Sequence, residues 1–201
     1  MPDRLFFPLA AILAGLLVVL AMQPALGALP SGAWSGGDSD YRDMRLNGLD
    51  LNRISSGGEA QINLVTDSDP IYLEIETAVG DLSDDPLLGP HVRISEDIEL
   101  ANSGHIVEVS VVARAGERLG AEQMLINYST GREGESGWQS FNLTREWATY
   151  SFTYEVPLKT GERALDYFAI RPVTPEKTRS LWVSEFRMQR IRPWTTDDPQ
   201  G

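Results

Sequence analysis

Aromatic residues that stand among polar neighbours are the part of this sequence whose chemistry is easiest to specify. Trp138, Tyr128 and Tyr167 each lie near amide, carboxylate or guanidinium side chains. An exposed aromatic ring can stack on the apolar face of a sugar, while flanking polar groups hydrogen-bond its hydroxyls. The candidate ligand-binding residues are therefore Trp138, Tyr128 and Tyr167, together with the polar residues Asn127, Gln139, Arg171, Glu108 and Arg114.

Two interpretations of these aromatic side chains stay open. Glu108 and Arg114 join the candidate set because period-two alternation places them opposite the apolar residues of the same strand. Aromatic residues of this kind also pack in cores or at sheet edges, which is the commoner outcome. We assign Trp147, Phe152 and Phe168 to the core for that reason.

Acidic residues are numerous, but their spacing specifies neither catalysis nor a metal site. Hydrolysis of a glycosidic bond needs two carboxyl groups at a defined separation, and 29 Asp and Glu residues offer no unique pair. Residues 81–85 and similar clusters offer the oxygen ligands that calcium prefers, yet none repeats a complete calcium loop, which favours solvated loops. His91 and His105 have no nucleophile or zinc motif around them. We predict no catalytic residue and no cofactor, and make no prediction for a metal.

Short runs of alternating apolar residues must form the elements that position these side chains. Residues 106–114 and 150–156 alternate with period two, as strands do. Similar runs predict further strands at 42–51, 60–64, 71–77, 91–100, 123–129, 139–142, 167–172 and 181–192. No segment of ten or more residues after position 30 keeps a helical period with caps. The sequence predicts an all-β domain over residues 41–192, a two-sheet antiparallel β-sandwich of the jelly-roll kind.

Composition excludes several classes of partner and of chemistry. The chain has 201 residues and a formal net charge of −12, so nucleic acid phosphates would be repelled. It has no cysteine, which excludes disulfides and thiolate chemistry. We therefore predict no nucleic acid partner and a domain stabilised by its apolar core.

The N-terminal residues predict export or membrane attachment. Residues 5–22 are apolar throughout and follow Arg4, while Ala25 and Gly27 provide the small residues that a signal peptidase recognises. The length of the apolar stretch is also close to the ~20 residues that span a bilayer. Residues 1–28 are thus a signal peptide or a single membrane anchor, and either places the domain in the periplasm or outside the cell. We expect a flexible linker at 29–40 and a disordered tail at 193–201.

A family resemblance covers about residues 91–191. The segment 137–157, with Leu-Thr followed by a Glu-Trp turn and an alternating strand that closes at Val-Pro, resembles a recurring segment of carbohydrate-binding-module jelly rolls, the galactose-binding-like sandwiches. The strands at 105–115 and 181–191 stand in a similar order around it. The resemblance implies the jelly-roll fold, and a fold of this kind serves several functions.

This sequence departs from that family in its last strand. The family commonly carries an Asp pair near the centre of this strand, whereas this chain has Ser184 and Glu185. The calcium site that often accompanies the pair is therefore not carried over.

Three hypotheses about function follow. The first is a non-catalytic binding module for a glycan or exopolysaccharide, displayed outside the cytoplasmic membrane. The second is an assembly protein of the cell envelope, which binds another protein through a sheet face and uses the aromatic residues as an interface. The third is a glycoside-active enzyme on a sandwich scaffold.

Overall fold

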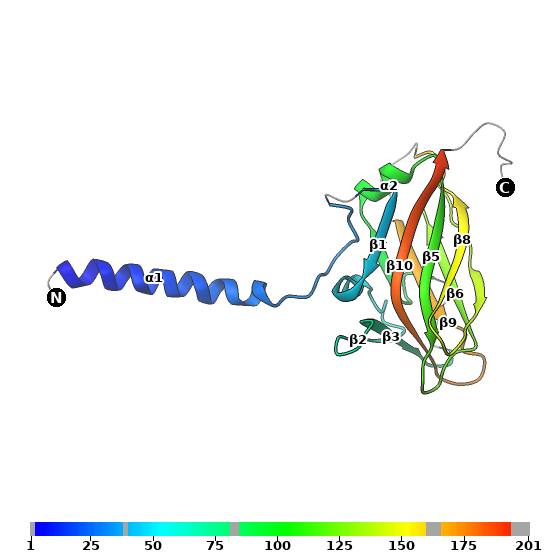
Figure 1. Ribbon diagram of the computed structural model, residues 1–201, viewed down its shortest axis with the longest axis horizontal. Helices are drawn as coiled ribbons and strands as arrows, with labels where there is room; N and C mark the ends of the chain where they lie inside the picture. The colour runs from blue at the N-terminus through cyan, green and yellow to red at the C-terminus, as the bar shows by residue number, and fades with distance from the viewer. Residues whose placement is uncertain (1–2, 38–39, 81–84, 160–165, 194–201) are drawn as a thin grey trace.

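A long N-terminal helix precedes the folded domain in this computed structural model, which describes residues 3–37, 40–80, 85–159 and 166–193. Helix α1 (Asp3–Leu26) projects away from the domain (Figure 1). Its side chains from residue 6 to residue 21 are exposed. Within the described part of the chain, no helix is both long and apolar enough to cross a membrane.

The domain is a sandwich of two antiparallel sheets, as the sequence predicted. Within the described residues, one sheet has six strands in the order β2-β3-β10-β5-β8, with β1 also paired to β10, and the other has four in the order β4-β9-β6-β7 (Figure 1). The six-stranded sheet contains β1 (Asp43–Asn47), β2 (Gln61–Val65), β3 (Tyr72–Thr77), β5 (His105–Ala115), β8 (Ala148–Glu155) and β10 (Arg179–Pro193). The four-stranded sheet contains β4 (His91–Ile94), β6 (Gln123–Ser129), β7 (Gln139–Asn142) and β9 (Asp166–Pro172).

The core lies between the two sheets and follows from period-two alternation. In β5, Val107, Val109 and Val111 are buried in the core, whereas Glu108 and Arg114 have the opposite parity and point outward. In β9, Phe168 and Ile170 are buried in the same core from the other sheet. Each strand therefore offers one set of side chains to the core and the other to a solvent-facing surface.

Two of the predicted strands end early because helical turns replace their second halves. The first stops at Asn47, where Gly48 adopts a φ of +57° and the 3-10 helix η1 (Gly48–Arg53) begins. The second stops at Ile94, and α2 (Glu96–Asn102) follows with acidic residues in its first turn. Both helices are shorter than the window in which a helical period can be recognised, which is why alternation alone predicts longer strands at these two places.

The predicted linker is partly folded onto the domain. Trp34 is 4% exposed and belongs to the core. Its amide donates to the Arg93 carbonyl at 2.7 Å, and its carbonyl accepts from the Ser95 amide at 2.9 Å. Asp97 of α2 accepts hydrogen bonds from the Ser35 hydroxyl and the Gly36 amide, both at 2.9 Å. Residues 30–37 are therefore a segment docked beside β4, while residues 38–39 lie outside the described residues. The tail was predicted at 193–201, but Pro193 is the last residue of β10, and residues 194–201 lie outside the described residues.

A buried charged cluster lies at one end of the sandwich. Asp166 is 1% exposed, and neither of its carboxylate oxygens has a hydrogen-bond partner among the described residues. Burial raises the pKa of Asp166 to about 7, against the lowering effect of Lys159 and with the help of Glu133. Lys159 is itself paired with Glu99. The carboxyl group of Asp166 is thus stable in the fold mainly when it is protonated.

This cluster predicts a loss of stability with rising pH. The pKa of Asp166 is higher in the folded than in the unfolded state. The folded state is therefore fully stabilised by the protonated carboxyl below about pH 4, and this stabilisation is lost as the pH rises through about 7. Three pKa units correspond to at most about 4 kcal/mol. Asp166→Asn should raise the free energy of unfolding above pH 7 and flatten its dependence between pH 5 and pH 8 in urea titrations. Asp67→Asn, at an exposed carboxyl, is the control and should keep the wild-type decrease of the free energy of unfolding between pH 5 and pH 8. If wild type and Asp166→Asn show the same pH dependence of this free energy, the raised pKa of Asp166 is contradicted.

Candidate carbohydrate-binding face

The outer face of the four-stranded sheet carries four of the eight predicted site residues: Trp138, Tyr167, Arg171 and Asn127. Arg171 and Tyr167 of β9 alternate with the core residues Phe168 and Ile170 and so point outward. Register places Leu125 of β6 opposite Arg171 on one side and opposite Ser140 of β7 on the other. We call this surface the Trp138 face, after the aromatic residue that precedes β7.

Trp138 is held by a cation-π contact. The guanidinium carbon of Arg171 lies 4.1 Å from the centroid of its ring. Such a contact contributes about 0.5–1 kcal/mol at an exposed site and fixes the orientation of the ring. The preceding Gly137 has a φ of +65°, a conformation that turns the chain into β7 and that glycine adopts without strain. Trp138 remains half-buried, so part of its surface faces solvent.

Asn127 and Gln139 position the loop beside Trp138. Asn127 is 1% exposed, and its amide donates to Glu135 Oε2 at 3.0 Å. The Ser136 hydroxyl donates to Asn127 Oδ1 at 3.3 Å, and Gln139 Nε2 donates to the Ser136 carbonyl at 2.8 Å. The amide of Asn127 is therefore committed to the protein, and the exposed Glu135 is the group this network presents to solvent.

Tyr167 lies further along the same face and is mostly covered. It is 8% exposed, and burial raises the pKa of its phenol, opposed by a hydrogen bond with Ser129. His91 of β4 meets the ring edge-on, with centroids 6.5 Å apart. The Nδ1 atom of His91 lies 2.9 Å from the Gly89 carbonyl oxygen, while its Nε2 atom is buried and has no hydrogen-bond partner in the part of the chain that the structure describes. With Tyr167 8% and His91 4% exposed, this part of the face offers little side-chain surface to a ligand.

Two residues that contact the predicted site residues of the Trp138 face, His91 and Glu135, were not among the predicted site residues. His91 has the parity opposite to the core residues Val92 and Ile94, so alternation in β4 could have placed it on this face. Glu135 lies in a polar loop without periodicity, and no local signal connects it to Asn127.

The structure places four aromatic residues whose positions were predicted as either ligand-binding or core, and it agrees with only some of these predictions. Tyr128 was predicted to bind a ligand, but it is fully buried and packs against Phe168 with ring centroids 4.7 Å apart. It shares the inward parity of Met124 and Ile126. Phe168 lies in the core as predicted, and Phe152 is half-buried and packs against the core. Trp147 was assigned to the core and is instead half-buried outside it, on the six-stranded sheet.

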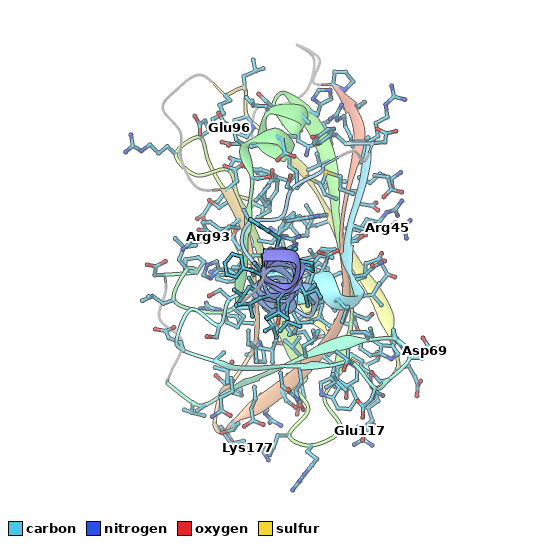
Figure 2. All side chains as sticks on the ribbon, turned by 90° about the vertical axis from the view of Figure 1, so that its left-hand side faces the viewer. Arg45, Asp69, Arg93, Glu96, Glu117 and Lys177 are labelled. Atoms are coloured by element: carbon cyan, nitrogen blue, oxygen red, sulfur yellow. The ribbon has the colours of Figure 1, made fainter. Side chains whose placement is uncertain are left out.

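The predicted polar residues divide between the two sheets. Glu108 and Arg114 lie on the outer face of the six-stranded sheet, because β5 belongs to that sheet. Figure 2 shows how far apart the two outer faces are, since Arg93 of β4 and Arg45 of β1 point to opposite sides of the domain. Glu108 and Arg114 therefore cannot contact a ligand that stacks on Trp138.

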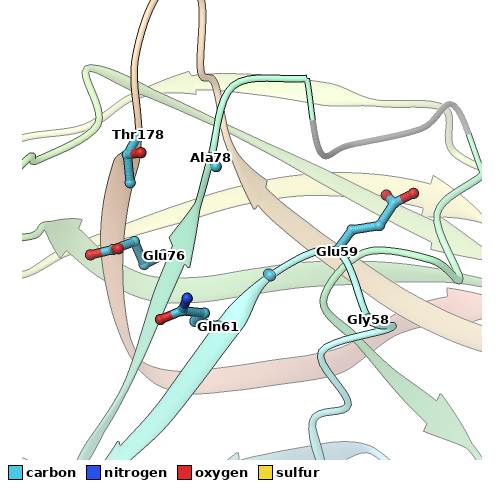
Figure 3. Close-up of a pocket in the computed structure, with 7 residues that line it drawn as sticks. Gly58, Glu59, Gln61, Glu76, Ala78 and Thr178 are labelled. Atoms are coloured by element: carbon cyan, nitrogen blue, oxygen red, sulfur yellow. The ribbon is translucent and has the colours of Figure 1, made fainter.

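Acidic side chains do not converge on a metal or catalytic site where the structure describes them. No group of three or more His, Asp and Glu residues could hold a metal ion among the described residues. Residues 81–84 of the most loop-like acidic cluster lie outside the described residues. A pocket of about 300 Å³ beside β2 is lined by Glu59, Gln61 and Glu76 among others. Figure 3 shows the two carboxylates of this pocket directed away from each other.

Comparison with solved structures identifies the fold class. No protein-family model matches the sequence, and neither does any curated protein sequence. The CBM22-2 xylan-binding domain of Xyn10C from Paenibacillus barcinonensis is similar, with a TM-score of 0.50, 14% identity, and coverage of 74% of this chain and 99% of that one. The tandem CBM22-1–CBM22-2 domain of the same protein gives a TM-score of 0.51 at 10% identity, covering 73% of this chain and 43% of the tandem.

The similarity to these two solved structures shows the architecture of this chain. The chain has the β-sandwich fold found in carbohydrate-binding modules, in agreement with the resemblance identified from residues 91–191. Identities of 10% and 14% are too low to carry any residue of a binding site from those domains to this one. The site must therefore be argued from the side chains of this chain.

The buried amide network generates a stability prediction. Asn127→Ala should lower the free energy of unfolding by about 1–3 kcal/mol, because Glu135 and Ser136 lose a buried partner. Urea titration measures the change. Asn142→Ala, on the neighbouring strand of the same sheet, is the control, since Asn142 is exposed and should change stability by less than ~0.5 kcal/mol. Similar values for both variants would show that the network does not stabilise the loop.

Proposed function

We propose that this protein is a non-catalytic glycan-binding module and that Trp138 is its principal stacking residue. The observation that carries the proposal is the half-buried indole of Trp138, fixed by Arg171 on an outer sheet face where a ring is not needed for the core. A sugar ring presents apolar C–H groups to such an indole, and its hydroxyls require polar partners.

Polar groups around Trp138 match that requirement. The carboxylate of Glu135, held by Asn127, can accept from sugar hydroxyls, and the guanidinium of Arg171 can donate to them. The donor comes from β9, the acceptor from the loop before β7, and the ring from the residue that directly precedes β7. Xylan, which the similar Paenibacillus domain binds, is one specific candidate for the ligand.

The proposal of a non-catalytic role is supported by the described acidic residues. Glycoside hydrolysis requires two carboxyl groups about 5–10 Å apart across the scissile bond. The two carboxylates that line the pocket beside β2, Glu59 and Glu76, diverge (Figure 3). On the Trp138 face, the carboxylate of Glu135 accepts a hydrogen bond from the amide of Asn127.

Export is the second part of the proposal. The apolar run at residues 5–22, preceded by Arg4, has the composition of an export signal, and α1 carries exposed apolar side chains that need a partner other than the domain. We propose that this segment directs the domain out of the cytoplasm, where it meets extracellular or periplasmic glycans.

Removing the indole should abolish most of the binding. Trp138→Ala is expected to weaken the binding of the best ligand from a glycan array by tenfold or more, about 1.4 kcal/mol, because the stacking surface is lost. Isothermal titration on the full chain measures this change. Leu158→Ala, at a leucine that is 61% exposed, is the control and should leave affinity within twofold. If no glycan of a broad array binds the wild type, the proposal fails.

Export can be tested by fractionation. The full chain expressed in a bacterial host should place the domain outside the cytoplasm, either free with a new N-terminus near Ala28 found by mass spectrometry or retained in the membrane fraction. Leu13→Arg, in the middle of the apolar run, should keep the domain in the cytoplasm because the charge opposes membrane insertion. An intact N-terminus on soluble cytoplasmic wild-type protein is the result that contradicts export.

A further inference from the structure

A second group of aromatic side chains lies on the opposite sheet. Tyr72 of β3, Trp182 of β10 and Arg114 of β5 come from three adjacent strands and have outward parity. Trp147 joins them from the position just before β8. We call these four residues the Trp147 cluster. None of them belongs to the apolar cluster between the sheets or packs against it as a partly buried residue.

Three of the four side chains form a base. Tyr72 and Trp182 are stacked, with centroids 4.3 Å apart and an interplanar angle of 18°. The guanidinium carbon of Arg114 lies 4.2 Å from the Trp182 ring centroid, and Trp182 Nε1 donates to Glu74 Oε1 at 3.1 Å. Trp182 is only 9% exposed although it stands on an outer face. Its ring is therefore covered by side chains of the cluster and is not itself a stacking surface.

Trp147 lies against this base. Its ring centroid is 5.9 Å from that of Tyr72, and the guanidinium carbon of Arg114 is 5.3 Å from it. Trp147 is half-buried, and both of these contacts are with residues of the base. The part of the indole directed away from the base consequently faces solvent. A large ring is thus held in place by cation-π and ring contacts on a surface where core packing does not require it.

Charged groups around Trp147 define which ligand fits. Arg114 Nη2 is bonded to Glu117 Oε1 at 3.1 Å, so this guanidinium is already neutralised. Glu74, Glu117 and Asp67 all act electrostatically on Tyr72, and Glu146 and Arg145 precede Trp147 in the chain. Carboxylates outnumber guanidinium groups here, and Figure 2 places Glu117 and Asp69 at the same end of the domain. An anionic ligand would be repelled and a cationic one attracted.

We infer that the Trp147 cluster is a second saccharide-binding platform, separate from the Trp138 face, and that it takes glycans bearing protonated amines, such as glucosamine oligomers. The indole of Trp147 stacks on a sugar ring, and an ammonium group on that sugar is attracted by the indole face and by the carboxylates of Glu74 and Asp67, which act on the same cluster. This platform does not depend on ligand binding at the Trp138 face, because the two surfaces lie on different sheets.

The experiment uses the full chain carrying Trp138→Ala, so that the Trp138 face cannot contribute. A glucosamine hexamer with protonated amines is the probe, and isothermal titration at low salt is the measurement. In this background the hexamer should bind, Trp147→Leu should weaken binding at least tenfold, and Trp147→Phe, which keeps an aromatic ring, should weaken it less than threefold. Thr149→Ala, at an exposed residue of β8, is the control and should leave affinity unchanged.

Charge provides an independent readout. Glu117→Gln, at a side chain that is 69% exposed, should weaken binding of the hexamer severalfold and reduce its dependence on salt. A galacturonic acid hexamer should not bind in the Trp138→Ala background. Equal binding of the two hexamers would overturn the inferred ligand class.

The same set of variants distinguishes a loss of folding from a loss of binding at either of the two proposed sites. Melting temperature and near-ultraviolet circular dichroism are recorded for each, and the Trp147→Phe and Trp147→Leu pair remains informative because both residues fill part of the space of the indole. Absence of hexamer binding in the Trp138→Ala background, or equal affinity of the Phe and Leu variants, overturns the inference. Hexamer binding that depends on Trp147 supports it, even if no glycan binds the Trp138 face.

Discussion

The C-terminal strand β10 is the element on which the six-stranded sheet depends. Its first residues pair with β3, residues 185–189 pair with β1, and β5 runs along almost its entire length. Strands from the beginning, the middle and the end of the domain are thus joined by one backbone ladder. Figure 1 shows β10 in the middle of this sheet. A defect in β10 would therefore disturb the core and the outer face together.

An irregularity in β10 decides which side chains reach the outer face. The register with β5 shifts between Val183 and Glu185. Before the shift, Leu181 and Val183 face the core, and after it Phe186 and Met188 do. The extra residue is a β-bulge, so odd-numbered residues of β10 face the core before it and even-numbered residues face the core after it. Trp182 is consequently directed outward beside Arg114, while the core stays apolar on both sides of the bulge.

Local alternation predicts where the strands lie and that they form a sandwich, but it misses the short helices that end two of them and it does not predict the site. Tyr128 shares its parity with Met124 and Ile126, and that pattern is a sufficient reason to assign it to the core. The pairing of Trp138 with Arg171 could not be predicted, because it depends on the order β9-β6-β7, which no residue pattern specifies. The burial of Trp34 is unpredictable for a similar reason, since it results from docking beside β4 and its surroundings in the sequence are polar.

The separation of inward and outward side chains explains how this fold can keep its architecture while its ligands change. The inward residues need only be apolar and of suitable volume, so a sandwich persists at 14% identity to a xylan-binding domain. Outward residues such as Trp138 and Trp147 contribute little to the core and can differ without altering the sheets. Arg171 gives one face a cationic partner for its indole, and Glu74 and Glu117 give the other an acidic border. Two surfaces of different charge on opposite sheets can therefore change independently of each other and of the core.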